Sequence, residues 1–207
     1  MSGRYKDDSL NSYTDILIEF FEVAIYNILY VRELYPSTSF ARRKHYGIPI
    51  QVSIHPAVRK YILNILSTAK ELMKRNELKK VSINVISSDS QIIERHVLHV
   101  ARFKDPIRTD DIYYTRLESS LRSLYLKQSV SLGNLKPLPQ GSRFSAHLHT
   151  TEMGTSLLED DINPQDFPFV LVPEEETKMS LPGILPISTI RLDNARLACY
   201  TLYEEKL

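Results

Sequence analysis

The sequence predicts an α+β fold, in which three helices pack on an antiparallel sheet and a long extended segment follows. Two observations predict the layered part. Apolar residues recur at helical steps in three long segments, and the segments between them alternate apolar with polar residues as strands do. A third observation predicts the extended part: after Thr151, prolines interrupt the chain repeatedly and no apolar stripe of helical period remains. That segment must find its strand partners on the rest of the domain or on another chain.

Residues 14–35 predict a helix that is buried on most sides and around which the other elements are organised. Its apolar residues form two adjacent stripes at three- and four-residue steps. Pro36 is expected to end this helix, and the polar residues before Asn11 are expected to fray. A membrane span would need about 20 apolar residues with few charges, and glutamates interrupt this run. The residues left to meet solvent are Glu19, Glu22, Tyr26 and Glu33.

The remaining elements follow in chain order. The basic run at residues 42–45 and the extended residues after it predict a connector with a small hairpin. A second helix is expected from Pro56 to near Asn76, because proline suits the first helical turn. A third helix is expected to begin at Asp110 and Asp111, whose carboxylates favour the positive end of the helix dipole. The expected strands span residues 81–85, 92–103, 144–148, 169–172 and 197–203.

Composition indicates one globular domain over residues 1–207, with a core of residues 1–151. The chain is 43% hydrophobic and 25% charged, and its length suffices for a sizeable core. The formal net charge of +1 provides no basic surface for gripping nucleic acid, so any link to DNA is expected to be indirect. Cys199 is the only cysteine, which excludes an internal disulfide and a cysteine-based zinc site. The first residues contain no apolar leader, so the nucleus or the cytosol is expected.

Few residues suggest chemistry. His147 and His149 are two apart in an expected strand and share a face, and His96 or His99 on a neighbouring strand could approach them. Three histidines and a water could hold zinc, but a solvated strand face is the favoured interpretation, because no HExxH spacing accompanies them. The sequence contains no glycine-rich phosphate loop, and the acidic run at residues 174–176 is typical of a solvated loop. We therefore expect no cofactor and no metal.

Six motifs along the chain carry a family resemblance. They are ILYVRELYP ending at Pro36, YGIPIQVSIHP ending at Pro56 with Tyr61 downstream, Ile93-Glu94-Arg95, Leu121-Arg122, HLHT at residues 147–150, and DFPFVL at residues 166–171. Together they resemble the HORMA family, and within it the accessory subunits of DNA polymerase zeta. One departure is Phe169, which stands where animal members usually have tryptophan.

The resemblance implies how such a protein would work. In HORMA proteins the C-terminal segment, here residues 152–207, is a mobile "safety belt" that closes over a partner's peptide, which is then held as an added strand. It implies a non-catalytic adaptor in translesion DNA synthesis that clasps the catalytic subunit of polymerase zeta and bridges to a translesion scaffold polymerase. It also implies a homodimer or a HORMA heterodimer and a nuclear location, with the cytoplasm as a further one. Direct contact with nucleic acid or membrane is not implied.

The resemblance further implies three groups of site residues. The expected apolar contacts to a partner peptide are Tyr61, Phe144, Phe169 and Leu171, for which plain core packing is the alternative. The expected surface on the belt for a second partner comprises Ile184, Tyr200 and Leu202. The expected dimer surface comprises Glu33, Arg42 and Arg122, for which solvated surface residues are the alternative.

Two other functions remain open. The first is a spindle-checkpoint or meiotic chromosome-axis HORMA protein, which would use the same clasp for different clients. The second is a small metal-assisted hydrolase using the histidine face. Zinc analysis separates the hydrolase from the adaptors, and the identity of the client separates the adaptors from each other.

Overall fold

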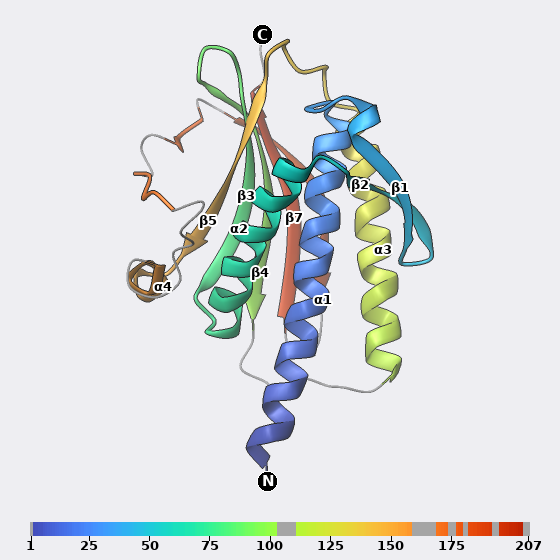
Figure 1. The fold of residues 1–207 in the computed structure, drawn as a ribbon, viewed down its shortest axis with the longest axis vertical. Coiled ribbons are helices and arrows are strands. Elements are labelled where there is room, and N and C mark those ends of the chain that lie inside the picture. The colour runs from blue at the N-terminus through green and yellow to red at the C-terminus, as the bar shows by residue number, and fades with distance from the viewer. Residues whose placement is uncertain are drawn as a thin grey trace.

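The computed structural model describes residues 2–102, 111–158, 169–173, 177–179, 182–191 and 195–204 (Figure 1). The helices are α1 Ser2–Val31, α2 Pro56–Lys74, α3 Asp111–Gly133 and α4 Glu152–Leu157, with a 3₁₀ turn at Ser37–Ser39. The strands are β1 Phe40–His45, β2 Ile48–Ser53, β3 Leu78–Ile86, β4 Ile92–Arg102, β5 Arg143–Thr150, β6 Pro182–Arg191 and β7 Ala195–Glu204. No helix in these ranges is long and apolar enough to cross a membrane.

The fold is two-layered, as the sequence predicts. The five-stranded sheet has the order β5-β3-β4-β7-β6, and every neighbouring pair is antiparallel. The helices α1, α2 and α3 lie against one face of the sheet, with β1 and β2 as a separate hairpin beside α1 (Figure 1). The β6–β7 hairpin, although last in the chain, pairs with β4 near the middle. The predicted hairpin of β3 and β4 and the third strand β5 are confirmed.

The boundaries predicted for the first helix are wrong at both ends. Helix α1 already includes the polar residues from Ser2 onward, and it ends at Val31, before Pro36 can act. Its end is a left-handed cap: Glu33 has a φ of 52°, and Leu34 N–H donates to Leu29 O at 3.0 Å. Tyr26, predicted to meet solvent, is only 1% exposed, because α2 packs against α1 on that side.

A buried polar network ties the end of α1 to the sheet. The guanidinium of Arg32 donates two hydrogen bonds to the Glu94 carboxylate, at 3.0 and 2.7 Å, and donates to the carbonyls of Leu132 and Lys136. Burial tends to raise the pKa of Glu94, but hydrogen bonds from His96 and Arg32 outweigh it and lower that pKa. The network thus joins α1, β4 and the end of α3.

The C-terminal segment differs from the prediction in three ways. It contains a helix, α4, whose N-cap Thr151 accepts from Gly154 N–H at 3.1 Å. Residues 169–172, predicted to be a β-like piece, are not in a strand. The ten-residue strand β6 contains Pro182 and Pro186, two of the prolines that were expected to separate short β-like pieces. Proline is tolerated there because β6 is the outermost strand, where an N–H can be missing without breaking the sheet.

Candidate functional site

The outer edge of β5 is one of the two edges of the five-stranded sheet. Within the part of the chain that the structure describes, β5 pairs with β3 and with no other strand. An edge strand presents unpaired N–H and C=O groups that another strand can use. The N–H of Ala146 donates to the Tyr61 hydroxyl at 3.2 Å, so it points away from β3. Because backbone groups alternate between the two edges of a strand, Phe144 and Leu148 share this orientation.

Aromatic side chains from β5, from α2 and from the segments that flank α2 and follow α1 gather beside this edge. The Phe144 ring lies 5.7 Å from the Tyr61 ring of α2 and 6.1 Å from the Tyr35 ring, both edge to face. Tyr35 follows α1, and its ring lies 6.3 Å from that of His55, the N-cap residue of α2. Burial, followed by the influence of Tyr61, raises the pKa of Tyr35. The structure therefore brings Tyr61 and Phe144 together, two of the residues expected to contact a partner peptide.

The other two expected peptide contacts lie in residues 169–173, drawn in orange on the β5 side of the sheet in Figure 1. Phe169 is half-buried, whereas Leu171 is 65% exposed and both of its valine neighbours face solvent as well. Further along, Arg95 of β4 holds the segment to the sheet: it donates to Asn84 Oδ1 at 2.8 Å and to the carbonyl of Thr177. Residues 170–172 thus present apolar side chains, and the carbonyl of Thr177, further along the chain, is bound to the sheet.

The three residues expected to contact a second partner also come together. Ile184 of β6 lies directly opposite Leu202 of β7, and Tyr200 lies two residues along on the same face. This face is the one away from the helices, since the alternate residues Cys199 and Thr201 are buried and Gln128 of α3 contacts Cys199 Sγ at 4.0 Å. Ile184 is 66% exposed. Their role stays a prediction.

The residues expected at a dimer surface are exposed and lie on three elements. Glu33 caps α1, Arg42 lies on β1 and Arg122 lies on α3. They make no ion pair with one another within the described ranges. Sequence reasoning missed two apolar residues four and eight positions beyond Arg122, Leu126 and Val130, which are 48% and 67% exposed. The four-residue spacing, which places all three on one side of α3, could have found them.

The hypothesis that His96 or His99 approaches the two histidines of β5 is wrong. Strand β3 lies between β4 and β5, and His149 instead contacts Ser82 of β3 at 2.9 Å. His96 lies on the helix-facing side, where its Nδ1 contacts Thr201 Oγ1 at 2.9 Å. Burial, with the charges of Lys80, His147 and Arg95, lowers the pKa of His149 to about 4. No group of three ligands suited to a metal occurs among the described residues.

The low pKa of His149 predicts that the protein becomes less stable as the pH is lowered. The unfolded imidazole has an ordinary pKa of 6.5, whereas the folded one stays neutral down to about 4. The unfolded chain therefore binds more protons in this window, and the free energy of unfolding falls as the pH is lowered through it. We expect His149→Gln to flatten this dependence, measured as urea midpoints from about pH 7 to about pH 4.5. Parallel profiles for the variant and the unchanged protein would show that His149 does not contribute.

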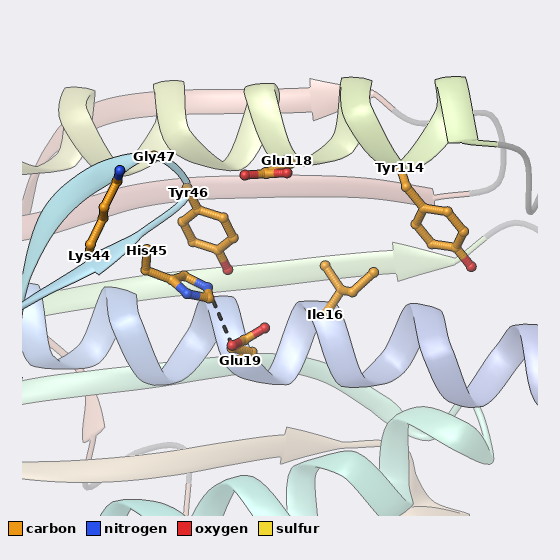
Figure 2. Close-up of a pocket in the computed structure, with 8 residues that line it drawn as sticks. All are labelled: Ile16, Glu19, Lys44, His45, Tyr46, Gly47, Tyr114 and Glu118. Atoms are coloured by element: carbon orange, nitrogen blue, oxygen red, sulfur yellow. Dashed lines mark ion pairs between the residues drawn. The ribbon is translucent and has the colours of Figure 1, made fainter.

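A pocket of about 480 Å³ lies away from β5, between α1, α3 and the β1–β2 turn. Figure 2 shows Glu19 facing His45, 3.3 Å away, with the Tyr46 ring between them and Glu118. Burial, followed by Glu19 and Glu118, raises the pKa of Tyr46. The positive φ angles of Tyr46 and Gly47 form the tight turn that places these side chains. Two carboxylates, those of Glu19 and Glu118, line the pocket, and none of its lining residues lies on β5.

Comparisons with known proteins agree with this architecture. The HORMA domain model matches residues 14–177. The chain is 34% identical to the zebrafish (Danio rerio) "Mitotic spindle assembly checkpoint protein MAD2B", covering 93% of this chain and 90% of that protein. It is 30% identical to "DNA polymerase zeta subunit 2" of Drosophila melanogaster, over 88% of this chain and 92% of that protein. The structure of HTP-2 bound to HTP-3 motif-6 superimposes with a TM-score of 0.73 at 13% identity. The superposition covers 95% of this chain and 92% of that chain.

An antiparallel sheet covered by helices on one face, with a C-terminal hairpin at one edge and β5 at the other, defines the class of fold. The chain belongs to the HORMA domain family. Its relatives include proteins named as subunits of DNA polymerase zeta and as a spindle-checkpoint protein.

Proposed function

We propose that this protein is a non-catalytic adaptor subunit of DNA polymerase zeta that acts in translesion DNA synthesis. The observation that carries the proposal is the open edge of β5, which lies next to the Tyr61 and Phe144 rings. An extended peptide can add to such an edge through backbone hydrogen bonds, while apolar pockets select its alternate side chains. The name of the Drosophila relative supports polymerase zeta as the assembly.

The client in this proposal is a segment of the catalytic subunit. It pairs with β5, and residues 152–207 form the safety belt that closes over it. Phe169 and Leu171 cover the client from the belt, and the Arg95 bonds to Asn84 and Thr177 hold the belt on the sheet. The exposed apolar side chains of residues 170–172 support this arrangement of the belt. Neighbouring apolar side chains that are exposed together are typical of a surface that a partner covers.

A second partner, a translesion scaffold polymerase, binds the outer face of the β6–β7 hairpin in this proposal. The clustering of Ile184, which is 66% exposed, with the half-buried Tyr200 and Leu202 supports such a surface, because apolar side chains that remain accessible on one face are typical of binding sites. The surface lies at the opposite end of the sheet from β5. The adaptor could thus hold both partners at once. The proposed location is the nucleus, with the cytoplasm as a further one.

Self-association is proposed through the side of α3 that carries Arg122. An exposed arginine can make paired hydrogen bonds to a carboxylate that other side chains cannot reproduce. We expect Arg122→Ala to convert a dimeric sample to monomer in sedimentation velocity. Arg116→Ala, at another exposed position of the same helix, is the matched control and should leave the dimer intact. An unchanged sedimentation coefficient for Arg122→Ala would place the dimer surface elsewhere.

A spindle-checkpoint or meiotic-axis role is the second candidate. It is favoured by the checkpoint name of the zebrafish relative. Calorimetry with peptides tiling the polymerase zeta catalytic chain, and with checkpoint and axis peptides, tests both. The proposal expects binding to one polymerase segment. Binding only to checkpoint or axis peptides would contradict it.

A further inference from the structure

The hydroxyl of Tyr61 makes a hydrogen bond at the edge of β5 to which a client strand would add. It accepts from Ala146 N–H at 3.2 Å, on the edge of β5 that faces away from β3. A client strand added to that edge would place its own carbonyl on an outward-pointing N–H. One N–H cannot make a good hydrogen bond to both acceptors, because each requires near-linear geometry. The Tyr61 hydroxyl and a client carbonyl therefore compete for one donor.

We propose that the Tyr61 hydroxyl occupies the place of a client carbonyl on Ala146 N–H until a client strand displaces it. This inference rests on the proposed function and extends it, because it gives two opposing roles to one side chain. The ring, packed 5.7 Å from Phe144, anchors the client, whereas the hydroxyl occupies the edge. Covering an edge N–H in this way also limits unwanted pairing with other strands.

The two roles separate in a single-atom substitution. Tyr61→Phe keeps the ring and removes the acceptor, so the empty protein loses the hydrogen bond and the client-bound protein does not. We expect the client affinity to rise about two- to tenfold, the range that a net neutral hydrogen bond represents. In the empty protein, hydrogen exchange of the Ala146 amide should become faster.

Two control variants make the assignment specific. Tyr35→Phe removes a hydroxyl from the same aromatic cluster, in which Tyr35 lies 6.1 Å from Phe144, and should leave the affinity unchanged. Ala146→Pro removes the contested donor at an edge position where proline can be accommodated. In the Ala146→Pro background, adding Tyr61→Phe should no longer change the affinity, because the donor for which the two acceptors compete is gone.

The test is calorimetry of these variants with a peptide from the polymerase zeta catalytic chain, after circular dichroism has shown each variant to be folded. Tighter binding by Tyr61→Phe, lost in the Ala146→Pro background, is the expected result. Binding that is unchanged or weaker in Tyr61→Phe, although the unchanged protein binds, overturns the inference and leaves the proposed function standing. If no peptide binds the unchanged protein, both fail.

Discussion

Replacing Glu94 with glutamine is expected to destabilise the protein by about 3 kcal/mol or more. The substitution keeps the side-chain shape but leaves the Arg32 guanidinium, which is 4% exposed, without a counter-charge. Breaking a buried pair by removing one partner typically costs about 3–5 kcal/mol. Urea unfolding should therefore show a lower midpoint at neutral pH.

A surface pair provides the matched control for Glu94. Lys70 Nζ and Asp15 Oδ1 are only 2.6 Å apart, yet the two side chains are 35% and 54% exposed. Asp15→Asn should cost less than about 1 kcal/mol, as exposed pairs do. Similar losses for Asp15→Asn and Glu94→Gln would show that the buried network does not stabilise the fold.

The pH dependence supplies a second check on Glu94. Its folded pKa lies below the usual value of 4.5, so its stabilising contribution is present above pH 4.5 and is lost as the pH falls through the folded pKa. The difference in stability between the unchanged protein and Glu94→Gln should shrink below about pH 4.5. A difference that grows in acid would contradict this assignment.

Truncating Tyr61 or Phe169 to alanine is expected to weaken client binding at least about tenfold. Aromatic anchors at buried sites commonly lose about 2 kcal/mol on truncation, and about 1.4 kcal/mol corresponds to a factor of ten. For Tyr61→Ala, losing the ring outweighs freeing the Ala146 N–H, since a net hydrogen bond represents only about 0.5–1.5 kcal/mol. Calorimetry with the client peptide measures both variants.

His147→Ala is the control for the two anchors. His147 lies on the same strand as Phe144, but its side chain is on the opposite face of the sheet, because strand residues alternate. The substitution His147→Ala should therefore leave the client affinity nearly unchanged. Loss of affinity in His147→Ala without loss in Tyr61→Ala would move the binding site to the histidine face.

The layered architecture was predictable because it depends on periodicity. The strands β3, β4 and β5 and the helix α2 show their apolar patterns over many residues, and the structure confirms them. The ends of α1 were not predictable in this way. A left-handed cap at Glu33 can be made by many sequences, so the proline at position 36 was a misleading signal.

Long-range partners account for the other differences. From the sequence alone, Arg32 is interpreted as the polar end of a helix. Its partner Glu94 is 62 residues away, so the sequence does not indicate that the two side chains meet. Pro186 is interpreted as a residue that interrupts a strand, because the sequence does not show that β6 is the outermost strand of the sheet. At the candidate site, Tyr61 and Phe144 were named from resemblance alone. Their ring contact and the bond from Ala146 to Tyr61 depend on how α2 packs on β5.

Backbone hydrogen exchange along β5 tests the central claim most directly. In the client-free protein the outward-pointing amides of Phe144 and Leu148 should exchange readily, because no strand in the described part of the chain pairs with that edge. A client peptide from the polymerase zeta catalytic chain should slow the exchange of these two amides and of Ala146. Amides of β6, the outermost strand at the other side of the sheet, should be unaffected. A peptide that binds tightly while the β5 amides keep their exchange rates would contradict strand addition at this edge.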